Sequence, residues 1–375
     1  MVHVFIVNRT TFKYHLEYLF AGTGAKDKLS MFLSNPNVSN YNAATERNLV
    51  GMIADISRIR ANDKIIFYLT SGNNSEGMFF GTFKAVNTPF FDENNNQNYL
   101  HSEMGKGLSY RVNIIPDVVY AKGITEHQYL DSLEGINQVS DMCWSLIYRK
   151  LKGNRGCTMI TDKEYVRLKN LLKKANNNIP LQIDNECGLT FNLSNNEIEF
   201  GEKHSYLGLK NAINIKDRLI YKFERSQAFE THLQAYILKN IDVAPLKDLL
   251  LKDGLQTWIG NEVSCGVGMQ RIDILTIQED ENNVYVNIIE LKCGEAYSDI
   301  VNKQLPWYIN WFNDYICPTY DKHIIIQPVV LTYETLGIAN NAVVNCNKLK
   351  ENAELKPVKN IFFKIENNDI SFRIL

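Results

Sequence analysis

The chain has 375 residues, of which 45% are hydrophobic and 22% charged, so it can bury large cores and is not a disordered protein. Its 40 basic residues face 42 acidic ones, and the net charge of -2 excludes a general attraction to nucleic acid or to acidic membranes. The length predicts two or three domains.

Seven cysteines are widely spaced and form no CxxC pair, which is typical of free thiols in a reducing cytoplasm. The apolar run at the N-terminus ends at Asn8, too early for a signal sequence, and no stretch approaches about 18 apolar residues. We therefore expect a cytoplasmic protein without a membrane span.

Residues 1–135 alternate short β-rich runs with polar turns, and they predict a small, mostly β domain with a few helices. The four predicted strands cover residues 3–7, 64–70, 77–86 and 110–115. The polar tract between the second and third strands predicts a hairpin loop. A helix is predicted over 47–59, where Leu49, Ile53 and Ile56 share one face.

Residues 136–215 differ from the first part of the chain, and we interpret them as a basic helical segment that connects two domains. Helical patterns cover 144–151 and 162–175, and three asparagines at 176–178 end the second helix.

The densest basic patch of the chain lies in this segment, at Arg149, Lys150, Lys152 and Arg155. Cations around a glycine-rich turn can neutralise phosphates without reading a base sequence. A solvated helix end, whose basic side chains offset the negative end of the helix dipole, explains the same residues equally well.

Residues 216–375 combine helices and strands in an α/β or α+β order. Helical patterns cover 225–240 and 299–314, and an apolar run follows the first of them at 246–251. The predicted strands cover 271–278, 284–292 and 323–332, and a closing hairpin covers 360–365 and 370–375.

The clearest chemical signal comes from two of these strands, which we expect to pair around the turn at 281–283. Glu290 and Lys292 lie two residues apart and therefore share a face, with Leu291 turned into the core. Pairing would bring Asp273 of the preceding strand near Glu290. Two carboxylates supply the oxygen ligands that divalent cations need, and a lysine beside them can polarise water or a scissile phosphate.

The alternative is a Glu–Lys pair on the exposed face of an edge strand, because such triplets are common. The apolar neighbours Ile288, Ile289 and Leu291 make the strand look buried, where an isolated charge pair is unfavourable. From these residues alone, the two interpretations are balanced.

An ordered set of motifs spans about residues 220–330. Its members are a helix with Glu230, a strand with Arg271-Ile272-Asp273, a strand with Glu290-Leu291-Lys292, and a helix with Gln304 and Tyr308. This order resembles the PD-(D/E)XK nuclease superfamily, specifically its RecB-like branch and the NucS-type DNA endonucleases of archaea and bacteria. The usual G-R-I-D sequence is Q-R-I-D here, and the nearest glycines are at 266 and 268.

The resemblance implies a role for each matching residue. Asp273 and Glu290 would bind Mg²⁺, which Mn²⁺ could replace, and Lys292 would be the catalytic lysine. Glu230 would orient a water on the metal. Gln304 and Tyr308 would support the site or the backbone of the substrate.

The strands of residues 1–135 carry a second ordered set, made of an Asn8 turn, a D-K-I-x-F-Y strand, a G-x-F strand and a Y-R-V strand. This set resembles the EVE/YTH branch of PUA-like domains, which are small β-barrels that hold a flipped, often modified, nucleobase. The resemblance implies that Tyr68, Phe90 and Phe91 supply stacking faces and that Asn8 reads the base edge. Phe67, Phe79 and Phe83 alternate with apolar residues and are expected in the barrel core.

The fold class expected is therefore a multidomain α+β and α/β protein, with a PUA-like β-barrel at 1–135, the basic segment at 136–215 and a nuclease core at 216–375. The expected activity is Mg²⁺-dependent endonucleolytic cleavage of double-stranded DNA, in a restriction-type enzyme that senses a modified base. A NucS-like enzyme specific for sequence or structure and a non-catalytic reader are the alternatives. RNA stays open as a substrate, since PUA-like modules also read RNA. A homodimer is one way to cut both strands, and no membrane partner is expected.

Overall fold

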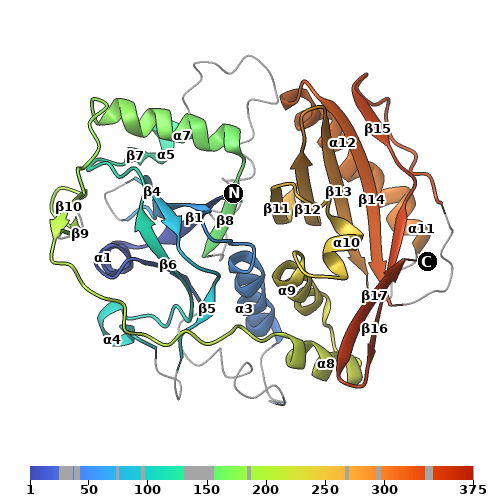
Figure 1. The fold of residues 1–375 in the computed structure, drawn as a ribbon, viewed down its shortest axis with the longest axis horizontal. Helices are drawn as coiled ribbons and strands as arrows, with labels where there is room; N and C mark the ends of the chain where they lie inside the picture. The colour runs from blue at the N-terminus through green and yellow to red at the C-terminus, as the bar shows by residue number, and fades with distance from the viewer. Residues whose placement is uncertain are drawn as a thin grey trace. The chain divides into compact units, whose positions relative to one another are not determined.

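The computed structural model describes residues 1–24, 37, 43–72, 76–93, 98–130, 156–183, 187–266, 270–292, 297–333 and 341–374. They divide into two compact units, the first comprising the described residues up to Asn214 and the second those from Ile215 onward (Figure 1). Within the described residues, no helix is both long and apolar enough to span a bilayer.

The first unit is built on a sheet with the strand order β2-β6-β4-β3-β1-β8, with β5 added beside β6 and β7 beside β4. The strands are β1 (Val2–Val7), β2 (Phe20–Thr23), β3 (Lys64–Leu69), β4 (Met78–Ala85), β5 (Phe90–Phe91), β6 (Tyr110–Pro116), β7 (Ile124–Thr125) and β8 (Cys157–Ile160). The four strands predicted for this region and the β3–β4 hairpin are confirmed. Phe67, Phe79 and Phe83 are fully buried, as expected of core residues.

The sheet bends at β6, because the start of this strand pairs with β2 and β5 while its end pairs with β4. The described strands follow an open path from β2 to β8. The first unit is therefore mixed α/β with a curled half-barrel sheet, where the sequence predicted a PUA-like β-barrel with helices.

The helices of the first unit are α1 (Arg9–Glu17), α3 (Ala43–Ile56), α4 (His101–Met104), α5 (Glu126–Leu130) and α7 (Asp162–Ala175), and a separate hairpin is formed by β9 (Gly188–Asn192) and β10 (Glu197–Gly201). Helix α1 packs on this hairpin, where the Phe12 and Phe191 rings lie 4.9 Å apart. The predicted helix at 162–175 is confirmed, and it begins with a capping box between Thr161 and Glu164.

The segment expected to connect two domains, residues 136–215, is described at 156–183 and 187–215, and its described part up to Asn214 belongs to the first unit. Strand β8 pairs antiparallel with β1, and all four of its residues are buried. Leu168 and Leu172 of α7 join the same core as Val2 and Val4. The described part is thus no separate connector, because burial of these apolar side chains completes the edge of the sheet.

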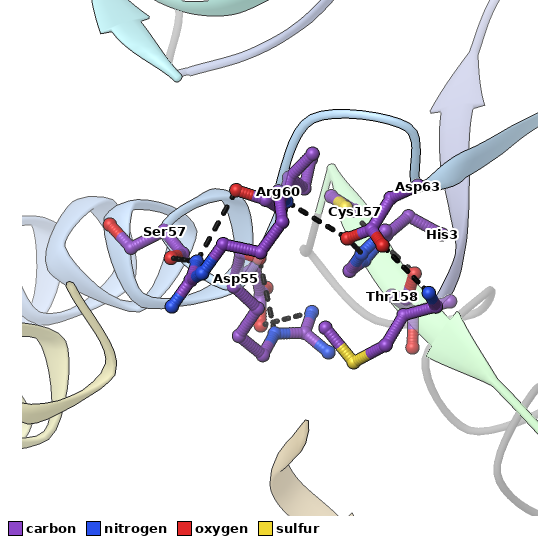
Figure 2. Close-up of polar contacts among 10 residues, drawn as sticks. His3, Asp55, Ser57, Arg60, Asp63, Cys157 and Thr158 are labelled. Carbon is purple, nitrogen blue, oxygen red and sulfur yellow. Dashed lines mark hydrogen bonds and ion pairs between the residues drawn. The ribbon is translucent and has the colours of Figure 1, made fainter. Parts of the chain in front are cut away.

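A buried polar network ties the start of β1 to the turn before β3 (Figure 2). Asp63 Oδ2 lies 3.0 Å from His3 Nε2 and accepts a hydrogen bond of 2.8 Å from the Arg60 backbone N–H. Burial lowers the pKa of His3 to about 4, so the ring is neutral at pH 7. Burial alone would raise the pKa of Asp63, but the hydrogen bonds and charges of His3 and then of the N-terminal ammonium outweigh it and lower the pKa to about 2.

These two shifts predict that acid destabilises the protein. The unfolded chain protonates His3 below about pH 6.5, whereas the folded one resists protonation until about pH 4, so stability present above pH 6.5 is lost as the pH falls through this window. Asp63 adds a loss between its usual value of 3.8 and about 2. Between pH 7 and 4 the free energy of unfolding should drop by about 3 kcal/mol more in the wild type than in His3→Gln. Urea titrations measure this difference, and the exposed His127→Gln should behave like the wild type.

The second unit has a sheet with the order β11-β12-β13-β14-β16-β17, with β15 beside β14. Its strands are β11 (Thr257–Ser264), β12 (Arg271–Glu279), β13 (Asn283–Lys292), β14 (His323–Thr332), β15 (Ala353–Leu355), β16 (Lys359–Glu366) and β17 (Asp369–Ile374). Strand β14 pairs parallel with β13, β15 and β16, and the pairs β11–β12, β12–β13 and β16–β17 are antiparallel. Every strand predicted from the sequence is confirmed, and β11 and β15 are additional.

The helical elements of the second unit are α8 (Lys216–Glu224), α9 (Glu230–Asn240), α10 (Leu246–Leu250), α11 (Tyr297–Asp299), the π-helix η2 (Ile300–Gln304), α12 (Leu305–Tyr315) and the 3₁₀ turn η3 (Cys317–Thr319). The predicted helix at 225–240 begins later, at Glu230. Ser226 has a left-handed φ of 50°, and the Gln227 N–H bonds back to the Lys222 carbonyl, so the chain turns between α8 and α9. Pro306 stands in the first turn of α12, where proline is tolerated.

Candidate functional site

The antiparallel pairing of β12 and β13 brings the sequence-predicted carboxylates together. Ile274 pairs with Ile289, and continuing this register by one residue puts Asp273 opposite Glu290. The backbone N–H of Leu291 donates a hydrogen bond of 2.8 Å to Asp273 Oδ2. Leu291 itself is fully buried, as predicted. The Gln234 side-chain amide on α9 donates to the Asp273 carbonyl at 2.9 Å and so attaches this helix to β12.

The surroundings of Asp273 disfavour its ionised form. Burial, and after it the negative charge of Glu290, raise the pKa of the Asp273 carboxyl well above its usual value, although the Leu291 N–H acts in the opposite direction. Glu290 is only 3% exposed. Two carboxylates in such a place repel each other, and a cation between them would relieve the repulsion.

Lys292 supplies a positive charge beside these carboxylates. Its Nζ lies 3.1 Å from Glu290 Oε1 and 3.9 Å from Glu230 Oε1, and its side chain is 11% exposed. Burial lowers the pKa of Lys292, but the charges of Glu290 and Glu230 outweigh burial and raise the pKa above its usual value. Lys292 therefore stays protonated and can act as a fixed positive charge, not as a base.

Glu230 and Tyr308 reach this group from two helices. Glu230 is the first residue of α9, and its side chain is 45% exposed. Tyr308, in the first turns of α12, is buried and donates a hydrogen bond from its hydroxyl to Glu290. Burial, followed by the charges of Glu290 and Asp273, raises the pKa of Tyr308 above its usual value, so it remains a neutral phenol.

Gln304 is the last residue of the π-helix η2, directly before α12. Its Oε1 is buried and accepts no hydrogen bond from the described residues. The structure therefore brings five of the six predicted residues into one group, and Gln304 stands directly before the helix that carries Tyr308.

Two residues that sequence reasoning missed also adjoin the site. Burial, and then the charge of Glu290, raise the pKa of the Cys265 thiol to about 12. The Trp307 indole N–H donates to the Cys265 carbonyl at 2.7 Å, which joins the end of β11 to α12. Gly266 follows with a φ of 103°, and an added β-carbon there would lie 3.4 Å from the Trp307 ring. The only sequence signal for this contact was the position of Trp307 next to Tyr308.

The donor set fits a hard divalent cation in part. The described residues contain no group of three or more His, Cys, Asp or Glu side chains placed to hold a metal. Asp273 and Glu290 would therefore supply two oxygen ligands, and water or substrate oxygens would complete the shell, as is common for Mg²⁺. The mutual repulsion of these carboxylates is the observation that favours such an ion.

The residues predicted to hold a base already make contacts within the fold. Asn8 caps helix α1, where its Oδ1 accepts a hydrogen bond of 2.8 Å from the Thr11 N–H. Tyr68 is 2% exposed, and its hydroxyl donates to Glu126 at 2.5 Å. Both groups are used by the fold itself.

Phe90 and Phe91 form the short strand β5 and are also buried. The Phe90 ring lies 5.7 Å from that of Tyr206, and the Phe91 ring lies 5.8 Å from that of Tyr110. The stacking role that we predicted for these aromatic residues is therefore corrected, because protein side chains already cover the rings. The predicted phosphate-binding residues Arg149, Lys150, Lys152 and Arg155 lie outside the described residues.

No model of a known protein family matches the chain, and no curated protein matches it. Several solved structures are similar at low identity. The human THYN1 protein in complex with 5-methylcytosine-containing DNA is 12% identical, over 46% of this chain and 97% of that one, with a TM-score of 0.27. The DUF55 domain of human thymocyte nuclear protein 1 is 11% identical, over 46% and 99%, with a TM-score of 0.27.

A hypothetical protein from Leishmania major is 9% identical, over 46% of this chain and 95% of that one, with a TM-score of 0.29.

Proposed function

We propose that this protein is a metal-dependent nuclease that hydrolyses phosphodiester bonds in DNA, with its active site at Asp273, Glu290 and Lys292. One observation carries the proposal. Two carboxylates lie on paired strands, the Glu290 side chain is only 3% exposed, and an ammonium group lies 3.1 Å from it. Such a group is unfavourable in a structural role, and it suits a reaction that develops negative charge on phosphate oxygens.

In this proposal Asp273 and Glu290 hold Mg²⁺, with Mn²⁺ as a substitute. The bound ion supplies an activated water and stabilises charge in the transition state. Lys292 remains protonated and binds a phosphate oxygen of the substrate. Tyr308, by donating to Glu290, fixes the orientation of that carboxylate, and Glu230 helps to hold Lys292 in place.

The first unit is proposed to select the substrate. Its sequence resemblance to EVE/YTH domains supports reading of a flipped, modified base in double-stranded DNA, which makes a restriction-type enzyme the favoured form, with a homodimer as one route to double-strand cuts. A NucS-like enzyme that recognises structure or sequence is the second candidate. The two differ in whether cleavage depends on base modification.

The direct test is cleavage of plasmid DNA prepared from modified and unmodified sources. We expect products in Mg²⁺ or Mn²⁺ and none in excess chelator, because two carboxylates without a cation cannot generate the attacking hydroxide. Restoring Mg²⁺ after the chelator should restore cleavage, which controls for irreversible unfolding. Equal cleavage with and without divalent cations would contradict the proposed active site.

A further inference from the structure

A cavity of about 330 Å³ lies against the sheet of the second unit, between the chain that follows α10 and strands β12, β13 and β14. Its lining includes Lys252, Tyr285, Asn287, Gln327 and Lys359. A second cavity of about 450 Å³ shares Gln327 and Lys359 with the first. The two cavities therefore adjoin at Lys359.

This cavity opens on the face of the sheet opposite to the candidate active site. Tyr285 and Asn287 alternate along β13 with Val286 and Ile288, and successive residues of a strand point to opposite faces. Glu290 belongs to the same alternating set as Ile288. A ligand in the cavity would thus be separated from the carboxylates by the sheet itself.

Two lysines give the cavity its charge. The Lys252 ammonium lies 5.1 Å from the centre of the Tyr285 ring, and Lys359 Nζ donates to the Leu249 carbonyl at 2.5 Å. Within the described part of the chain, neither ammonium forms an ion pair with a carboxylate. A third lining lysine, Lys356, is paired with Glu354 at 2.6 Å, and Asp248 is the one acidic side chain among the described lining residues.

The charge of Lys252 also acts on Lys359. Burial, and then the positive charge of Lys252, lower the pKa of Lys359 below its usual value. Two ammonium groups that line one cavity and form no ion pair with a carboxylate of the described residues make the cavity complementary to an anion.

The chain that carries Lys252 is held in place by side chains of the sheet. Gln278 Oε1 accepts from the Lys252 N–H at 2.7 Å, and the Gln278 amide donates to the Lys252 carbonyl at 3.0 Å. The Asn287 amide donates to the Leu250 carbonyl at 2.7 Å. Fixing both ends of this short loop keeps the position of Lys252 constant before any ligand arrives, which favours binding.

We propose that this cavity is a phosphate-binding site, in which Lys252 and Lys359 bind the phosphate oxygens of a nucleic-acid backbone or of a free phosphate compound. A cavity of this volume lies at the lower end of the range for small-molecule sites and accommodates a phosphate group with part of a sugar. The site is separate from the proposed active site and does not depend on cleavage.

The test uses the full chain in chelator, where no cleavage interferes, and two probes, namely a fluorescent 12-nucleotide DNA and inorganic pyrophosphate. For the probe that the site binds, Lys252→Gln should weaken binding by a factor of about ten. If that probe is DNA, the slope of its salt dependence should also fall by about one charge. Lys252→Arg should restore binding. The control is Lys216→Gln, which removes a partly exposed lysine paired with Asp369 elsewhere in this unit and should leave binding unchanged.

Loss of DNA binding alone would identify a backbone phosphate as the ligand, and loss of pyrophosphate binding would identify a free phosphate compound. Lys252 is exposed, so Lys252→Gln should keep the wild-type melting temperature. Lys359→Gln is the second variant, and it also removes the hydrogen bond to the Leu249 carbonyl. The proposal is overturned if the wild type binds neither probe, or if a folded Lys252→Gln binds both as the wild type does.

Discussion

Asp273→Asn should abolish DNA cleavage and, in chelator, leave the protein at least as stable as the wild type. The substitution removes a metal ligand, which should reduce the cleavage rate by a factor of about a thousand or more. It also removes the repulsion between Asp273 and Glu290, while the amide oxygen can still accept from the Leu291 N–H. Single-turnover cleavage and thermal melting measure the two effects on one preparation.

Lys292→Gln should reduce cleavage comparably for a different reason, since it removes a fixed positive charge and leaves the metal ligands in place. The matched control is Lys303→Ala, which removes an exposed lysine of η2 paired with Asp299 at 2.8 Å. It should cleave as the wild type does. Full activity of folded Lys292→Gln in Mg²⁺ would contradict the nuclease assignment, and loss of activity in Lys303→Ala would show that charge near α12 matters in general.

The proximity of Asp273 and Glu290 could be predicted from the sequence because it depends on local rules. A polar turn at 281–283 joins two apolar strands, and the two-residue period of a strand fixes which side chains share a face. The structure confirms the hairpin and the burial of Leu291. The contact between Trp307 and Cys265 could not be predicted in this way, because it depends on how α12 packs against the end of β11.

The distinction between local and long-range contacts also explains why some predictions for the first unit were wrong. Strand β8 has four residues and pairs with β1, more than 150 positions away. No local turn joins the two strands, so their pairing could not be predicted from the neighbouring sequence. Alternating aromatic residues mark a strand, but they do not distinguish a core ring from one that lines a pocket. Tyr68, Phe90 and Phe91 were therefore assigned to a base pocket, whereas the structure packs them against Glu126, Tyr206 and Tyr110.

The pairing of β8 with β1 changes how base recognition has to be tested. A fragment ending at residue 135 would lack β8 and α7, whose side chains complete the core that contains Val2 and Val4. Such a fragment should unfold or aggregate, so its failure to bind would say nothing about base recognition. The full chain carrying Asp273→Asn is the appropriate reagent, because it should bind DNA without cutting it.

This full-length variant should bind a duplex with one modified base about tenfold more tightly than the unmodified duplex, because stacking and hydrogen bonding of a single base contribute roughly 1–3 kcal/mol. Fluorescence anisotropy on duplexes with cytosine, methylcytosine, hydroxymethylcytosine and methyladenine measures the preference. Of the residues predicted to read the base, Asn8 has hydrogen-bond donors that it can still present to a base edge. Its Oδ1 is used by the helix cap, and its amide N–H groups make no hydrogen bond within the described residues.

Asn8→Ser should then erase the preference, since serine keeps the cap on α1 but has no amide to read a base edge. Thr161→Ser makes an equally conservative change at the cap of α7 and should leave the preference intact, which separates base reading from a general effect of changing a cap residue. If the full-length protein binds all four duplexes equally, the first unit does not sense these modifications, and the NucS-like alternative is favoured. If the preference exists but survives Asn8→Ser, the base is read by residues other than the turn that follows β1.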